Sequence, residues 1–148
     1  MINGTVQAPW GIQVSGILFA RSALPVNITT GSDNNRNGTS NDRPDLASGV
    51  VLDSNNQFNR ASFVAPGTRS GNLPRNAARG PSYWQIDLRV QKAFDLGRSR
   101  LDVFAEAFNL TNHVNLFNPV GNLASTSFGR STQADIARQV QLGVRMGF

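Results

Sequence analysis

Residues 139–148 read Gln-Val-Gln-Leu-Gly-Val-Arg-Met-Gly-Phe, and this stretch decides the fold class. An apolar side chain stands at every second position, and the positions between hold polar residues or glycine. Because successive side chains of a β-strand point to opposite faces, the stretch predicts a strand with one wholly apolar face. The residues of that face are Val140, Leu142, Val144, Met146 and Phe148.

Three further segments alternate in a similar way. We expect strands at about residues 11–21, 83–94, 100–110 and 138–148, each of about 10 to 12 residues. A typical soluble strand holds about 5 to 6 residues, whereas a tilted strand that crosses a bilayer needs about 9 to 11. The sequence therefore predicts an all-β protein whose antiparallel amphipathic strands belong to a transmembrane β-barrel.

The connections between these strands alternate in length. A short turn at 95–99 joins two of them, whereas long polar segments at about 22–82 and 111–137 join the others. Outer-membrane barrels have short turns on the periplasmic side and long loops on the extracellular side. A last strand that runs toward the periplasm would place both long segments outside the cell. Within the first segment we expect short strands, for example at 26–30 or at 49–52.

The composition argues against several kinds of functional site. The chain has no cysteine and a single histidine, so thiolate sites and histidine-rich metal clusters are excluded. The net charge of +5 comes from scattered arginines and one lysine, and the lack of a basic cluster argues against nucleic-acid binding. No nucleophile–base pair and no positioned pair of carboxylates stands out. We therefore expect no enzymatic activity.

Four long strands are too few to close a barrel, because the smallest membrane barrels have eight. Thr5–Gln7 resembles the end of a further strand, and a turn at Pro9–Gly11 follows it. We therefore expect residues 1–148 to form the C-terminal segment of a larger barrel. A complete eight-stranded barrel is the competing interpretation, and it needs more alternating segments than we find.

Three regions of the chain resemble a known family of membrane proteins. They are Arg75-Asn76-Ala77-Ala78-Arg79-Gly80-Pro81 followed by Trp84–Phe94, the strand end Glu106-Ala107-Phe108-Asn109-Leu110-Thr111-Asn112-His113, and Ser22–Val26 together with Asn41-Asp42-Arg43-Pro44-Asp45. Their order and spacing are similar to those of TonB-dependent outer-membrane receptors of the Oar-like group. The chain departs from that pattern at Thr111, where an aromatic residue is usual, and at Ser82, where glycine is frequent.

The resemblance implies a location, a role and a set of partners. Full-length receptors of this group lie in the bacterial outer membrane and import large substrates by energy-coupled uptake through a plugged barrel of about 22 strands. This chain would be a structural closing segment of such a barrel. The implied partners are outer-membrane lipid and lipopolysaccharide, the rest of the barrel and its plug, the outer-membrane assembly machinery, and TonB through an N-terminal part outside this sequence. The alternative function is that of a soluble secreted β-sandwich that binds carbohydrate or a surface.

Two sets of strand residues are candidate functional positions. The terminal alternating strand (Val140, Leu142, Val144, Met146 and Phe148) resembles the signal by which the assembly machinery recognises its clients, because an exposed strand edge can pair by strand addition. The charged residues Asp87, Arg89, Asp102, Glu106 and Arg145 would face the lumen of a barrel. Acids and arginines of adjacent strands can pair there. We expect a hydrated, salt-bridged surface at these positions and no substrate-coordinating site.

Residues near the strand ends support the same arrangement. Trp10, Tyr83 and Trp84 stand where an aromatic girdle of a membrane barrel would lie. His113 follows a strand end in a segment rich in asparagine. Because it has no second histidine or carboxylate at ligand spacing, we expect it to be a surface or turn residue.

One loop resembles part of a calcium site. Asp33, Asn35 and Asn37 place side-chain oxygens at alternate positions, as in the first half of a calcium loop, and Asp42 is close enough to contribute. Pro44 occupies the position where a bidentate acid is expected. A polar loop stabilised by Asx turns to its own backbone is the favoured interpretation. We therefore expect no cofactor, with calcium as the minority alternative.

Overall fold

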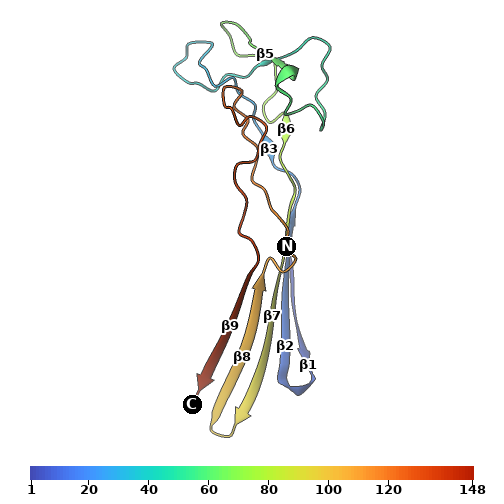
Figure 1. Cartoon of the computed structure of the whole chain (residues 1–148), viewed down its shortest axis with the longest axis vertical. Helices are drawn as coiled ribbons and strands as arrows, with labels where there is room; N and C mark the ends of the chain where they lie inside the picture. The colour runs from blue at the N-terminus through green and yellow to red at the C-terminus, as the bar shows by residue number, and fades with distance from the viewer. The chain divides into compact units, whose positions relative to one another are not determined.

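The computed structural model describes all residues, 1–148, and its largest element is one antiparallel sheet. The sheet contains β1 (Ile2–Ala8), β2 (Ile12–Arg21), β7 (Tyr83–Leu96), β8 (Ser99–Phe108) and β9 (Gln139–Gly147). Its strands neighbour one another in the order β1-β2-β7-β8-β9, which is an up-and-down meander (Figure 1). β1 and β9 are therefore the two edges of the sheet.

Two tight turns lie at one end of the sheet. The 3-10 turn η1 (Pro9–Gly11) joins β1 to β2, and within it Trp10 has a φ of 61°. The turn between β7 and β8 passes through Gly97, whose φ of 75° is readily adopted by glycine. At the opposite end Arg21 pairs with Tyr83, and the long connections leave the sheet there. Short and long connections thus alternate along the meander, as expected.

The strand register sorts the side chains of the sheet onto two unlike faces. Val14 lies opposite Val90, whereas the neighbouring Ser15 lies opposite Arg89. The apolar face consists of Ile2, Val6, Ile12, Val14, Leu18, Ala20, Trp84, Ile86, Leu88, Val90, Lys92, Phe94, Leu101, Val103, Ala105, Ala107, Val140, Leu142, Val144 and Met146. The polar residues of the other face are Asn3, Thr5, Gln7, Gln13, Ser15, Arg21, Tyr83, Gln85, Asp87, Arg89, Gln91, Asp95, Arg100, Asp102, Glu106, Gln139, Gln141 and Arg145, and Ile17, Phe19, Phe104 and Phe108 lie among them.

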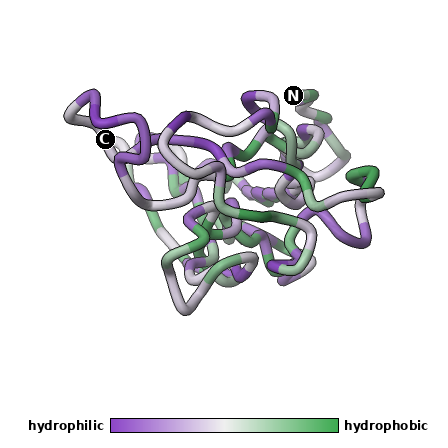
Figure 2. Tube along the Cα trace, turned by 90° about the horizontal axis from the view of Figure 1, so that it is seen from above, coloured by the Kyte–Doolittle hydropathy of each residue, from purple (hydrophilic) through white to green (hydrophobic).

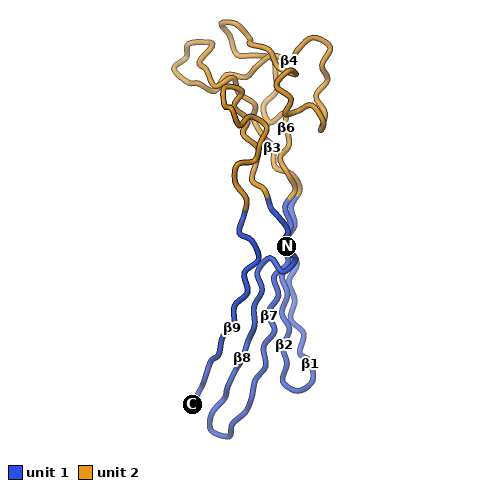
Figure 3. Tube along the Cα trace, viewed as in Figure 1, with its two compact units in different colours: residues 1–21, 83–115, 135–148 blue, residues 22–82, 116–134 orange.

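A second compact unit, which we call the loop unit, is formed by residues 22–82 and 116–134 (Figure 3). Its regular structure is limited to β3 (Pro25–Val26), β4 (Asp45–Leu46), η2 (Arg60–Ser62), β5 (Phe63–Val64) and β6 (Ala78–Arg79). β3 pairs with β6, and β4 pairs with β5. The buried core lies in this unit and consists of Val26, Ile28, Phe63, Leu73, Ala78 and Phe128.

The structure corrects one short strand that we expected inside the loop unit. Residues 49–52 form no strand, so that prediction is wrong. Gly49 has a φ of 76°, and the N–H of Val50 donates to the carbonyl of Ala47 at 3.1 Å, so the chain turns there. The strand expected at 26–30 is reduced to the end of β3 and an isolated bridge.

The predicted all-β fold class, with antiparallel amphipathic strands and long polar connections, is confirmed. A soluble sandwich would bury the apolar side of its sheet against a second layer. Here Leu142 is 81% exposed and Val144 is 66% exposed, so the alternative of a β-sandwich is wrong.

In Figure 2 hydrophobic and hydrophilic residues follow one another in short stretches along the trace. No helix in the structure has the length and apolar character needed to cross a bilayer.

Candidate functional site: the two faces of the sheet

The polar face carries a chain of hydrogen bonds across three strands. Arg89 of β7 lies opposite Glu106 of β8, and 2.5 Å separates a guanidinium nitrogen from the Oε1 atom of Glu106. A second guanidinium nitrogen of Arg89 donates to Gln91 at 2.9 Å, and the group lies 4.1 Å from the ring centroid of Phe104. Gln141 of β9 donates to the other carboxylate oxygen of Glu106. The two charges therefore neutralise each other on this face.

A second ion pair on the polar face runs along one strand. Asp102 of β8 lies opposite Arg145 of β9 in the register. Its ion pair is nevertheless with Arg100 of β8, with 3.0 Å between Nε and Oδ1. The register places all five charged candidates on this face, and the Arg89–Glu106 contact is the one ion pair that crosses strands.

A polar cluster lies on the same face at the end where the long connections leave. The hydroxyl of Tyr83 is 2.7 Å from Gln85 Oε1 and 2.8 Å from Asp135 Oδ2. Gln85 donates through Nε2 to Asp87 at 2.7 Å, and the same carboxylate oxygen accepts the N–H of Asn109 at 2.9 Å. This chain of bonds ties the segment before β9 to β7 and to the end of β8.

Asp135 is held as an anion in this cluster. Its carboxylate accepts the N–H of Ile136 at 2.8 Å and the hydroxyl of Tyr83, and these bonds hold the pKa of Asp135 below its ordinary value. The guanidinium of Arg21 lies 5.1 Å from the ring centroid of Tyr83 and adds a positive charge beside it. The rim of the polar face is therefore charged and hydrogen-bonded.

Two buried asparagines fix the chain beyond β8. Asn109 is 2% exposed and has a φ of 49°, a conformation that asparagine tolerates. Its amide accepts the N–H of His113 at 3.0 Å and donates to the carbonyl of His113 at 2.9 Å. Asn115, also 2% exposed, bonds the N–H and carbonyl of Trp84 at 3.1 and 2.9 Å, and so acts as a short extra strand partner. The ring of His113 stacks on Trp84 with 4.4 Å between centroids.

The apolar face has no protein layer over β9. Val140, Leu142, Val144 and Met146 are all at least half exposed, and Phe148, just beyond the strand, is 96% exposed. β9 pairs with β8 along one side only, so its other side presents unpaired backbone groups. The five residues predicted to form an assembly signal thus lie on a free, amphipathic sheet edge.

The ends of the apolar face carry aromatic side chains and one charge. Trp84 lies at the end of β7 from which the long connections leave, and Phe94 lies near the tight turns, where Trp10 of η1 is 82% exposed. Lys92 shares this face, with its Nζ 4.9 Å from the ring centroid of Phe94. Tyr83 does not belong to this rim, because it is adjacent to Trp84 and therefore faces the polar side.

The loop considered as a calcium site bonds its own backbone. Asp33 accepts two backbone N–H bonds at 3.0 and 2.7 Å, and Asp42, which is 2% exposed, accepts two at 2.6 and 2.9 Å. Asn35 and Asn37 each accept one more. The bonds accepted by Asn35 and Asn37 come from the N–H two residues on and are the Asx-type bonds of the favoured interpretation. No group of three or more His, Cys, Asp or Glu side chains is arranged to hold a metal ion. The expectation of no cofactor, with calcium as the minority alternative, stays a prediction.

Several residues of the two faces were not singled out from the sequence. Lys92 on the apolar face could have been found, because the alternation that places Val90 and Phe94 there includes it. Asn115 and Asp135 gave no local signal, because their partners on β7 lie 31 and 52 residues away in the chain.

The geometry agrees with what one comparison with known proteins returns. A family model described as an outer membrane beta barrel domain matches residues 6–141, a range that contains β2, β7 and β8 in full. No curated protein and no solved structure matches the chain. The family match covers most of the chain and accounts for an apolar face that no protein layer covers. The chain therefore belongs to the outer membrane beta barrel domain family and is located in the bacterial outer membrane.

Proposed function

We propose that this chain is a structural part of the wall of a TonB-dependent, Oar-like transport barrel. The observation that carries the proposal is a sheet with one exposed apolar face, one hydrogen-bonded polar face and two free edges. The role is that of a scaffold without catalysis. It supplies strands to the barrel and the long connections between them.

The free edges support the presence of further strands. In hydrocarbon each unpaired backbone group costs several kcal/mol, so membrane sheets close on themselves. Five strands are fewer than the eight of the smallest membrane barrels. β1 and β9 are thus the places where the remaining barrel strands pair, and β9 is also the edge that the assembly machinery reaches by strand addition.

The two faces define an environment for each side of the wall. The apolar face contacts lipid, and its rim residues Trp84 and Trp10 lie where barrels have aromatic girdles. Lys92 extends its ammonium group toward the headgroups, because it lies near the end of β7. The polar face lines a water-filled lumen, and the long connections lie outside the cell.

The TonB-dependent part of the proposal rests on the resemblance of five sequence segments to the Oar-like group. Two of them, Ser22–Val26 and Asn41–Asp45, lie in the loop unit, and Arg75–Pro81 follows there. Trp84–Phe94 and Glu106–His113 lie on β7 and at the end of β8. Energy coupling and substrate uptake would require a plug and a TonB-binding segment, which the resemblance implies for the whole protein.

The test uses the entire reading frame that contains this chain. We expect its product to form a heat-modifiable barrel in outer membranes and to be retained by the immobilised periplasmic domain of TonB. The matched control is the 148-residue chain alone, which should give neither result. A heat-modifiable barrel that TonB does not retain would contradict TonB-dependent transport but would still support the role of the chain in a barrel wall. A heat-modifiable product from the 148 residues alone would contradict the role as one part of a larger wall.

A further inference from the structure

The loop unit contains a polar cavity that the barrel wall does not explain. Its volume is about 330 Å³, and polar or charged residues alone line it. The lining includes Asn27, Asn35, Asn37, Arg43, Ser70 and Arg75. Arg43 and Arg75 come from two of the motifs noted in the sequence. The two arginines are 32 positions apart in the chain, and both line this cavity.

The carboxamides of three residues that line the cavity have unengaged donor groups. The Oδ1 atom of Asn27 accepts the N–H of Asn76 at 2.7 Å. The Oδ1 atoms of Asn35 and Asn37 accept the N–H groups of Asn37 and Thr39 at 3.1 and 2.9 Å. With these acceptor atoms engaged, the Nδ2 groups of the same side chains remain as free donors. The cavity therefore matches a ligand rich in acceptor oxygens.

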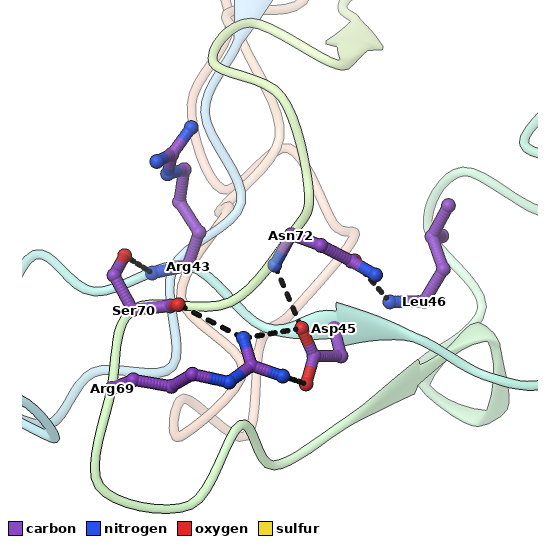
Figure 4. Close-up of polar contacts among 6 residues, drawn as sticks. All are labelled: Arg43, Asp45, Leu46, Arg69, Ser70 and Asn72. Atoms are coloured by element: carbon purple, nitrogen blue, oxygen red, sulfur yellow. Dashed lines mark hydrogen bonds and ion pairs between the residues drawn. The ribbon is translucent and has the colours of Figure 1, made fainter.

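The charged residues that line the cavity also favour an anionic ligand. Its one acid, Asp42, is buried and accepts two backbone N–H bonds on Oδ2. The structure contains three ion pairs, and neither Arg43 nor Arg75 takes part in them. By contrast Arg69 is bound in a fork to Asp45 at 3.1 and 2.7 Å, and the side chain of Arg43 extends away from that pair (Figure 4). Two guanidinium groups at the cavity thus lack a protein counter-ion.

The backbone beside both arginines is fixed. The N–H of Arg43 donates to Ser70 Oγ at 3.4 Å, and its carbonyl accepts the N–H of Gly71 at 2.7 Å. Gly71 is required there, because a Cβ atom would overlap the carbonyl group of Pro44. The residue after Arg75 is held through its own N–H by Asn27. This anchoring lowers the cost of ordering the site when a ligand binds.

We propose that the cavity binds a soluble sugar that carries an oxyanion, with Arg43 and Arg75 pairing with its phosphate or carboxylate group. Guanidinium groups match both anions through paired, charge-assisted hydrogen bonds. The free carboxamide donors then meet the hydroxyl oxygens of the sugar body. The site lies within the loop unit, so it goes beyond the role of the chain in the barrel wall.

The experiment measures equilibrium binding to the whole protein, purified from outer membranes in detergent, by isothermal titration calorimetry. The probes are glucose 6-phosphate, glucuronate and neutral glucose. The variants are Arg43→Gln and Arg75→Gln, and Arg36→Gln is the matched control, because Arg36 is an exposed arginine of the same unit outside the cavity lining. No uptake step enters the measurement, so its result is independent of TonB-dependent transport.

We expect one or both acidic sugars to bind and glucose to bind at least tenfold more weakly. Each cavity variant should weaken the binding of the acidic sugar about tenfold or more, since it removes a charge-assisted hydrogen bond to the anion. Arg36→Gln should leave the affinity unchanged. Binding of the phosphate sugar alone or of the carboxylate sugar alone would identify the anion. Equal affinity for glucose, no binding of any probe at millimolar concentration, or an equal loss in Arg36→Gln would overturn the proposal.

Discussion

A charge placed on the apolar face of β9 should destabilise the barrel far more than the same charge on the adjacent residue. Leu142 lies on the apolar face and is 81% exposed, whereas Gln141 lies on the polar face and bonds Glu106. With a rise of about 3.4 Å per residue, Leu142 is roughly 10 Å along the strand from Gln139 and roughly 17 Å from Gly147. Leu142→Arg therefore inserts a guanidinium group near the middle of the hydrocarbon layer.

The size of the expected destabilisation follows from the depth of the substituted residue in the bilayer. An arginine on the lipid face of a barrel costs about 2–4 kcal/mol at the bilayer midplane and about 0–1 kcal/mol near the interfaces. Gln141→Arg should change the free energy of unfolding by less than about 0.5 kcal/mol, because its side chain faces water beside the Glu106 carboxylate. The two variants should differ by about 2 kcal/mol or more, which is roughly a 30-fold change in the folding equilibrium.

The assay is reversible urea unfolding of the whole barrel in lipid vesicles, followed by the heat-modifiable band on gels. Both variants carry the same added charge, so a general effect of charge on assembly cancels between them. Equal destabilisation by Leu142→Arg and Gln141→Arg, or a larger loss for Gln141→Arg, would refute the assignment of the apolar face to lipid.

Three further changes test the polar face and its rim. Glu106→Gln should lower the free energy of unfolding only slightly, because its partner Arg89 is 39% exposed, and high salt should reduce the difference from the unmodified protein, as measured by urea unfolding. The pKa of Asp135 is lower in the folded than in the unfolded protein. Ionised Asp135 therefore stabilises the fold above its unfolded-state pKa, and this stabilisation is lost as the pH falls through the folded-state pKa. Tyr83→Phe removes one of the bonds that lower this pKa, so stability should fall less steeply at acidic pH in a plot of stability against pH. Asn115→Ala should cost about 1–3 kcal/mol, because it leaves buried backbone groups of β7 unpaired, and hydrogen exchange at the start of β7 should speed up.

The strands of the sheet were predictable because their signal is local. Alternation over Gln139–Phe148 and over residues 83–94 fixes both the strand and the face of each side chain without knowledge of the partner strand. Strand length added the membrane interpretation, since each predicted segment holds about 10 to 12 residues; in the structure β7 has 14. The five charged residues predicted for the polar face follow from the same alternation.

Features that depend on distant pairing were not predictable in this way. Asn115 acts as a strand partner to Trp84, and nothing near it in the sequence signals that role. Arg100 competes with the cross-strand partner of Asp102, and the pairing pattern alone does not decide between them. The cavity in the loop unit forms from segments that meet only in the folded chain, so composition could not reveal it.

Spin-label accessibility along β9 tests most directly which face of the sheet contacts lipid. The chain has no cysteine, so single cysteine substitutions at positions 140, 141, 142, 144 and 145 give unique labels; Gly143 is left unchanged, because a Cβ atom there would overlap the ring of Phe104. In vesicles containing the whole barrel, labels at positions 140, 142 and 144 should be relaxed by oxygen dissolved in the bilayer. Labels at 141 and 145 should be relaxed by a water-soluble nickel complex. Accessibility that does not alternate, or that alternates with the opposite phase, would contradict the assignment of lipid and water to the two faces.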